Sequence, residues 1–209
     1  MATTKLSPGY ESILQFLIDY RYLTVEMLTQ LCGLHTRTVQ KKTKELLHEN
    51  LLQMVPRYNS NSRGRPEQVL GVTQSGFELI YKKSKWGTKE DQYFNLTGNL
   101  EHHLLNNRFR LWLRNTVSQD RNISFKYFDS NPIRKFKSEI TFSLGSRRFE
   151  FIPDAIFTIT HEEKEKSLLF FLEADTGTEP LRGLGAGRNS IEQKIQNYHL
   201  LFATKQYKE

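Results

Sequence analysis

Residues 24–73, TVEMLTQLCGLHTRTVQKKTKELLHENLLQMVPRYNSNSRGRPEQVLGVT, decide the fold expected of this chain. Thr24 suits the N-cap of a helix with an apolar inner face. A turn and a basic helix over residues 36–50 follow. Two strand-like runs, 51–57 and 68–73, then flank a polar, basic loop. The order helix, turn, basic helix, strand, basic loop, strand predicts a winged helix-turn-helix.

The segments on either side complete a domain over residues 8–85. A helix is expected over residues 10–20, since four apolar side chains fall on one face there: Ile13, Leu14, Leu17 and Ile18. Residues 74–85 predict a closing helix. The polar, charged segment 86–96 is expected to be a linker to a second domain.

The composition limits the class of protein. At 209 residues the chain has room for one large or two small domains, and 37% hydrophobic residues exclude a disordered chain. No apolar run approaches ~18 residues and no secretory signal is apparent, so no membrane partner and a cytoplasmic location are expected. The single Cys32 cannot form an internal disulfide, which fits a reducing compartment. A net charge of +7 suits a polyanionic partner.

The positive charge is concentrated on the predicted helix and loop. Residues 35–67 hold seven Lys or Arg against three Glu. A basic helix of this kind fits the major groove of double-stranded DNA, with its first residues nearest the base edges. The expected contacts are Thr36, Arg37, Thr38, Gln40 and Lys41, with Lys44 near a backbone phosphate and Arg63 and Arg65 reaching from the wing. The alternative is a basic, solvated face on a winged helix that contacts proteins.

The second half of the chain, residues 97–209, alternates between helical and strand-like patterns. A long helix is expected over residues 97–119 and a last helix over residues 190–202. Four strand-like runs lie between them: 123–129, 139–144, 148–160 and 167–175. This order predicts an α/β domain with a hairpin near its end.

Three carboxylates are expected to lie together on that hairpin. If Thr160 pairs with Ser167, Asp154 lies opposite Glu173 on a neighbouring strand. Glu173 and Asp175 share a face through the two-residue period of a strand. Such a cluster repels itself unless a cation is present, and Mg²⁺ or Mn²⁺ held by Asp154 and Glu173 is the natural candidate. The alternative is a structural network in which the acids pair with Lys194 or with arginines.

These residues carry a resemblance to known proteins. Pro153-Asp154 followed by Glu173-x-Asp175 resembles the PD-(D/E)xK nuclease signature. With the N-terminal winged helix, and with the runs EADTGTE at residues 173–179 and KIQNY at residues 194–198, the chain resembles the replication-relaxation family of plasmid and mobile-element proteins. The resemblance implies an α+β fold, in which a winged helix-turn-helix precedes a nuclease-like α/β domain with a mixed sheet.

The chain departs from the nuclease signature at one position. The signature has a lysine two residues after the glutamate, where this chain has Asp175. Lys194 on the last helix is the candidate substitute for that lysine, and Asp154, Glu173, Asp175 and Lys194 together form the candidate or vestigial catalytic set. The chain also ends soon after residues 190–202, where the fold usually has another strand, which indicates a shortened chain or a partner at the sheet edge.

Three functions follow from these patterns. The first is a non-catalytic DNA-binding factor of a plasmid or mobile element, acting in replication, DNA relaxation or its regulation. The second is a metal-dependent endonuclease aimed by the winged helix, and the third is a protein-interaction adaptor. Whether the protein is an enzyme stays open, with Asp175 favouring a non-catalytic role. A homodimer and an association with replication or relaxation proteins are the further partners considered.

Overall fold

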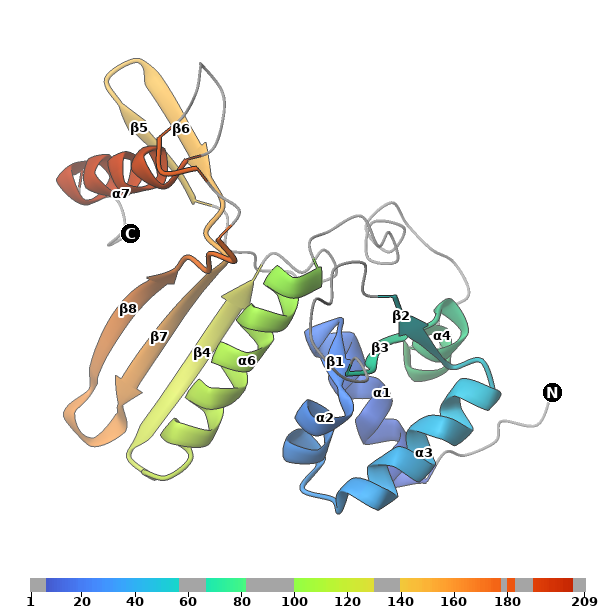
Figure 1. Ribbon diagram of the computed structural model, residues 1–209. Coiled ribbons are helices and arrows are strands. Elements are labelled where there is room, and N and C mark those ends of the chain that lie inside the picture. The colour runs from blue at the N-terminus through green and yellow to red at the C-terminus, as the bar shows by residue number, and fades with distance from the viewer. Residues whose placement is uncertain are drawn as a thin grey trace. The chain divides into compact units, whose positions relative to one another are not determined.

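The computed structural model describes residues 7–56, 67–81, 100–129, 140–177, 180–182 and 190–204 (Figure 1). They divide into two compact units, one ending at Asn115 and the other beginning at Thr116. The two units are described separately below.

The first unit has the topology of a winged helix-turn-helix. Its elements are α1 (Pro8–Tyr20), β1 (Leu23–Thr24), α2 (Val25–Cys32), α3 (Thr36–His48), β2 (Leu52–Val55), β3 (Val69–Val72), α4 (Gln74–Tyr81) and most of α6 (Leu100–Val117). The strands form one antiparallel sheet in the order β1-β3-β2, with Leu23 opposite Leu70 and Leu52 opposite Val72. The winged helix predicted from residues 24–73 is therefore present. The short strand β1 was not expected.

Local signals in the sequence set the ends of α2. Thr24 Oγ1 accepts a hydrogen bond from the backbone N–H of Met27 at 3.2 Å, which caps the helix as predicted. At the other end Gly33 has a φ of 62°, in the left-handed region, and its N–H donates to the carbonyl of Thr29 at 3.1 Å. A side chain at this position would strain the backbone, so glycine allows the sharp turn into α3.

The helix α6 packs on the core of the first unit. Leu104 and Leu111 belong to the same buried cluster as Leu17 and Leu28. The amide of Asn107, which is 8% exposed, donates to the carbonyls of Tyr20 at 3.0 Å and of Tyr22 at 2.7 Å. The compact unit thus reaches beyond the domain expected over residues 8–85. It takes in a helix that the sequence pattern had assigned to the second domain.

We predict that Asn107→Ala destabilises the first unit by about 2 kcal/mol, because it removes both hydrogen bonds of a buried amide. The Tyr22 carbonyl loses this donor, and the Tyr20 carbonyl keeps the N–H of Tyr22 at 2.8 Å. Urea unfolding of the full chain measures the change. Asn115→Ala is the matched control on the same helix, since the Asn115 amide is exposed and its hydrogen bond to Gln30 is long, at 3.4 Å. Equal losses of stability in the two variants would contradict the anchoring role of Asn107.

The second unit contains only antiparallel strand pairs among its described residues. Its elements are β4 (Ile123–Asp129), β5 (Ile140–Leu144), β6 (Arg147–Phe151), β7 (Ala155–His161), the 3-10 turn η1 (Glu162–Lys164), β8 (Lys166–Leu172) and α7 (Ile191–Thr204). The strands form a sheet in the order β4-β7-β8 and a separate hairpin, β5-β6. The mixed sheet implied by the nuclease resemblance is not found in this part of the chain.

The run 148–160, expected as one strand, is divided at Pro153. β6 ends at Phe151 and pairs with β5, whereas β7 begins at Ala155 and pairs with β4 and β8. A proline has no N–H to donate to a strand ladder, so a break at this position is physically reasonable. The division leaves Asp154 in the turn that leads into β7.

Aromatic rings attach α7 to the strands. The ring of Tyr198 lies 5.0 Å from that of Phe151 at the end of β6 and 5.4 Å from that of Phe171 near the end of β8, measured between centroids. Phe171 also meets Phe202 one helical turn further along, at 5.9 Å. Pairs of this kind stabilise beyond their buried area. They hold one face of α7 against the ends of β6 and β8.

Candidate functional site

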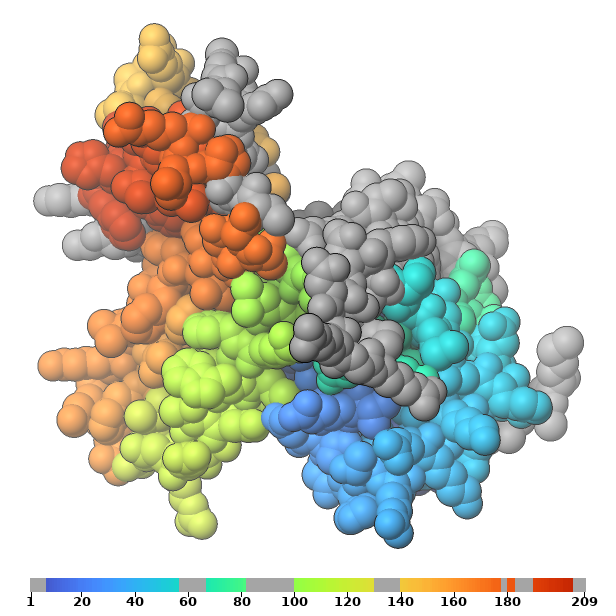
Figure 2. All heavy atoms as spheres, viewed as in Figure 1, coloured from blue at the N-terminus to red at the C-terminus, as the bar shows by residue number. Residues whose placement is uncertain are grey.

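One face of α3 is exposed and basic. Val39, Thr43 and Leu46 are buried, with exposed fractions of 0%, 4% and 2%. The residues expected to contact DNA on this helix are all exposed: Thr36, Arg37, Thr38, Gln40, Lys41 and Lys44. Figure 2 shows side chains of α3 on the surface of the first unit. The face of α3 that carries the expected contacts is therefore turned outward.

The first turn of α3 is fixed by a residue that the sequence reading missed. His35 is the N-cap, and its Nδ1 accepts from the backbone N–H of Arg37 at 3.3 Å. This nitrogen must be unprotonated to accept. Serine, threonine, aspartate and asparagine dominate N-cap positions, so the residue type gave no signal of the cap. The bond orders the turn that carries Arg37 and Thr38.

The two wing arginines, Arg63 and Arg65, lie outside the described residues. Their expected contact with DNA stays a prediction. The strands β2 and β3, from which this loop departs, pair over four residues from Leu52↔Val72 to Val55↔Val69. The base of the wing is thus present, as expected.

The second candidate site lies where β7 begins and β8 ends. The predicted hairpin register is confirmed: Thr160 pairs with Ser167, and Phe157 pairs with Phe170. The ladder ends at the pair Ala155↔Leu172. Asp154 and Glu173 are therefore the first residues beyond the last pair, and both Glu173 and Asp175 lie after the end of β8 rather than within a strand.

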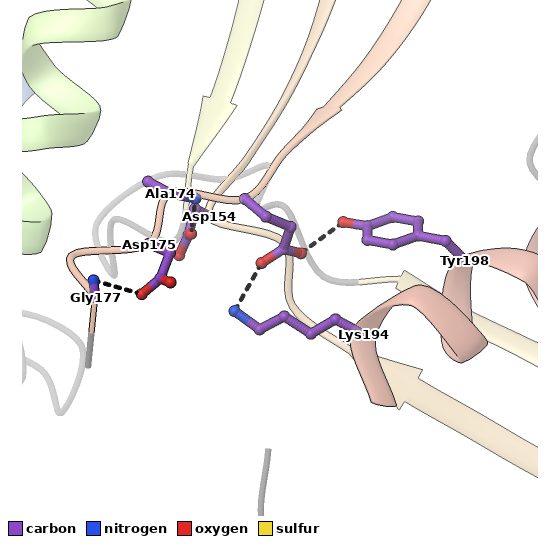
Figure 3. Close-up of polar contacts among 7 residues, drawn as sticks. Asp154, Ala174, Asp175, Gly177, Lys194 and Tyr198 are labelled. Carbon is purple, nitrogen blue, oxygen red and sulfur yellow. Dashed lines mark hydrogen bonds and ion pairs between the residues drawn. The ribbon is translucent and has the colours of Figure 1, made fainter. Parts of the chain in front are cut away.

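The backbone engages two of the three carboxylates. Asp154 Oδ2 accepts from the N–H of Ala174 at 2.7 Å, which joins the start of β7 to the segment after β8. Asp175 Oδ1 accepts from the N–H of Gly177 at 2.8 Å, two residues further on, in a local turn. Figure 3 shows Asp154 directed toward Ala174 and Asp175 directed toward Gly177.

Two side chains of α7 hold the third carboxylate. Lys194 Nζ lies 2.9 Å from Glu173 Oε2, and the Tyr198 hydroxyl donates to Glu173 Oε1 at 2.6 Å. Oε2 makes no well-aligned hydrogen bond, so the Lys194 contact acts as an ion pair. Lys194 and Tyr198 are four residues apart and so share a helical face (Figure 3). Lys194 therefore lies beside Glu173, one of the three acids, whereas the role of Tyr198 was not foreseen.

The Tyr198 phenol is kept protonated by its surroundings. Burial raises its pKa well above the usual range, and the hydrogen bond to Glu173 and the charges of Glu173 and Asp154 raise it further. Tyr198 therefore acts as a hydrogen-bond donor at neutral pH. Its ring is packed against Phe151 and Phe171, which fixes the direction of the hydroxyl.

A small pocket opens beside Glu173, Lys194 and Tyr198. Its volume is about 230 Å³, and its lining is formed by Glu173, Ala174, Asp175, Ile191, Lys194, Ile195 and Tyr198. Asp154 is not part of the lining. The pocket therefore combines one paired acid, one exposed acid and one lysine with apolar side chains of α7.

The arrangement does not fit a Mg²⁺ or Mn²⁺ ion. Among the described residues, no group of three or more His, Cys, Asp or Glu side chains is placed to hold a metal. Both oxygens of Glu173 face groups of α7, and Asp154 accepts from the backbone. Of the two sequence-based interpretations, the geometry favours a polar network over a metal site held by Asp154 and Glu173.

No helix in the described segments is both long enough and apolar enough to cross a membrane.

The fold and the exposed face of α3 define a winged-helix protein with a second α+β unit. The chain belongs to the Replication-relaxation family, whose model matches residues 14–209. The resemblance inferred from the sequence motifs is thereby confirmed.

Comparison with other proteins adds structural neighbours at low similarity. A MarR family transcriptional regulator from Silicibacter pomeroyi is 20% identical, with 56% of this chain and 75% of that chain covered and a TM-score of 0.36. MepR, a transcription regulator of the Staphylococcus aureus multidrug efflux pump MepA, is 15% identical over 55% and 80% of the two chains, with a TM-score of 0.33. An S. aureus MepR mutant bound to oligodeoxyribonucleotide is 15% identical over 55% and 79%, also at 0.33. No curated protein matches the chain significantly.

Proposed function

We propose that this protein binds double-stranded DNA through α3 and acts in the replication or relaxation of plasmid or mobile-element DNA, or in its regulation. The observation that carries the proposal is the exposed basic face of α3 on a winged-helix unit. Membership of the Replication-relaxation family supports the assignment to DNA transactions.

The charges on α3 are spaced to follow a groove. Arg37, Lys41 and Lys44 recur at intervals of four and three residues, so they form one stripe along the helix. Placing such a stripe beside DNA releases condensed counterions, which makes affinity fall steeply with salt. In this proposal Thr36, Thr38 and Gln40 meet base edges or phosphates, and Arg63 and Arg65 extend the contact from the wing.

We predict that replacing both Arg37 and Lys41 by alanine lowers affinity for duplex DNA at least about tenfold at 0.1 M salt, since two phosphate or base contacts are lost. The slope of log affinity against log salt should shrink by about 2 if both side chains contact phosphates. Fluorescence anisotropy in EDTA measures both quantities.

The matched control replaces Arg147 and Lys166, two exposed cations of the second unit, by alanine. This variant makes the same change in net charge and should bind nearly as the unmodified protein does. If the protein shows no salt-sensitive affinity for duplex DNA, the proposal is refuted and the adaptor function is favoured.

An endonuclease is the second candidate function. The observation that favours it is the ion pair of Lys194 with Glu173, since the nuclease signature places a lysine beside its acids. Against it, Glu173 is also held by Tyr198, and the carboxylates do not fit a metal. Cutting of supercoiled plasmid in Mn²⁺, lost in Asp154→Ala and Glu173→Ala, would establish this function in place of the non-catalytic one.

A further inference from the structure

A basic hollow lies between the start of α1 and the first half of α3. Its volume is about 470 Å³, and its lining consists of Tyr10, Arg37, Thr38, Lys41 and Lys42. Three of these five side chains are cationic and none is acidic. Two of the five lining residues, Tyr10 and Lys42, lie outside the set of DNA contacts expected from the sequence.

Lys42 does not belong to the stripe formed by Arg37, Lys41 and Lys44. Successive residues of a helix point about 100° apart, so Lys42 is turned from Lys41 toward the flank of α3. That flank faces α1, because the Lys42 ammonium lies 3.8 Å from the centre of the Tyr10 ring. The hollow therefore extends the basic surface sideways from the groove-facing stripe.

The position of Lys42 is fixed by its neighbours on α1. The ammonium gains a cation–π contact with Tyr10. A Cβ at Gly9 would lie 3.0 Å from Lys42 Cε and 3.2 Å from Nζ, so the lack of a side chain there lets the lysine rest against α1. A lysine that is already ordered loses less conformational entropy when it binds a ligand.

The nearby acid is directed elsewhere. The Tyr10 hydroxyl donates to Glu45 Oε2, and this bond is the main reason that the pKa of Tyr10 is raised. Among the described residues, no carboxylate lies within ion-pair distance of Arg37, Lys41 or Lys42. The like charges around the hollow repel one another, and within the described residues none of the three cations is neutralised by an ion pair.

We propose that this hollow seats a backbone phosphate of duplex DNA, with Lys42 as a direct contact and with Gly9 and Tyr10 as residues that position it. The inference rests on the proposed function and adds the start of α1 to the interface. A phosphate diester supplies the missing negative charge, and the volume accommodates the phosphate with part of its sugar. The contact is independent of base sequence.

Lys42→Gln should lower affinity alike for duplexes of unrelated sequence and should reduce the salt slope by about 1. Gly9→Ala keeps every charge but displaces the Lys42 side chain, so it should lower affinity in the same direction and by less. Lys166→Gln in β8, which removes one exposed charge of the second unit, is the matched control and should leave the slope unchanged. Thermal melting monitored by circular dichroism verifies that each variant is folded.

The outcomes separate this inference from the proposed function. If Arg37→Ala lowers the affinity but Lys42→Gln changes it no more than Lys166→Gln does, the phosphate seat is overturned. The proposed binding of DNA through α3 then still stands. A protein without affinity for duplex DNA overturns both. Displacement of the duplex by a mononucleotide at an equal concentration of phosphate groups would instead make the hollow a nucleotide site, which also overturns the inference.

Discussion

Gly76→Ala is expected to destabilise the first unit by at least about 3 kcal/mol, because the added methyl group has no room. A Cβ at this position would lie 2.2 Å from the carbonyl oxygen of Leu51 and 2.9 Å from Val72 Cγ2. The first of these contacts is with backbone, which no side-chain rotation relieves. Gly76 lies in the first turn of α4, so the gain in helix propensity from alanine is at most ~1 kcal/mol, and the clash outweighs it.

The start of α4 cannot move aside to relieve the clash. Thr73 Oγ1 donates to the carbonyl of Asn50 at 2.7 Å and accepts from the N–H of Gly76 at 3.1 Å. The N–H of Thr73 also donates to the carbonyl of Leu51 at 3.1 Å. These bonds tie α4 to the turn between α3 and β2, so the methyl group would strain the segment that joins α3 to the wing.

Urea unfolding of the full chain measures this effect, and Gly71→Ala is its matched control. A Cβ at Gly71 would meet its nearest atom, Val55 Cγ2, at 3.4 Å, which is close to ordinary contact. The control should cost less than about 1 kcal/mol. If the two variants unfolded at the same urea concentration, the close approach of α4 to Leu51 would be refuted.

The winged helix was predictable because its signals are local. Thr24, Gly33 and the apolar spacing of α2 and α3 each fix a helix end or a buried face within a few residues. β1 was not predictable, since two residues are too few for a strand pattern. The place of α6 was not predictable either. An apolar stripe in the sequence predicts that α6 packs against something, but does not identify its partner. The contacts of Asn107 and Leu104 show that the partner is the first unit.

The carboxylate site was predictable in its register but not in its chemistry. The pairing of β7 with β8 brings Asp154 and Glu173 to the same end of the hairpin, one residue beyond the last pair. The partner of Glu173 depends on the position of α7, which is set by rings far apart in the chain, such as Phe151 and Phe171. The sequence signal for Tyr198 is weak: it lies four positions after Lys194, so the two side chains share a helical face.

Glu173→Ala is expected to destabilise the second unit by about 2 to 3 kcal/mol. The change removes the ion pair of the Lys194 ammonium, whose side chain is 22% exposed, with Glu173, and it removes the acceptor of the Tyr198 hydroxyl. Removing one partner of a fully buried pair costs about 3–5 kcal/mol, and the partial exposure of this pair reduces that figure. Glu192→Ala is the matched control, since its contact with Arg182 is 4.0 Å long and largely exposed.

A second substitution separates the role of the charge from that of the hydroxyl. Lys194→Met in the Glu173→Ala background removes an ammonium that has lost its Glu173 ion pair, and should recover about half of the lost stability in urea unfolding. Without the Glu173 carboxylate, the pKa of Tyr198 should fall, which ultraviolet absorbance at alkaline pH detects as earlier phenolate formation. A failure of Lys194→Met to recover any stability would contradict the ion pair as the source of the loss.

The sign of the Glu173→Ala effect also bears on the choice between the two functions. Acids kept for chemistry are often held in a strained or repulsive setting, and their removal then stabilises the fold at the expense of activity. Glu173 is instead paired with Lys194 and hydrogen-bonded by Tyr198, as expected of a group that joins α7 to the end of β8. A loss of stability on its removal therefore favours the structural network and the non-catalytic DNA-binding function. A gain would favour the endonuclease.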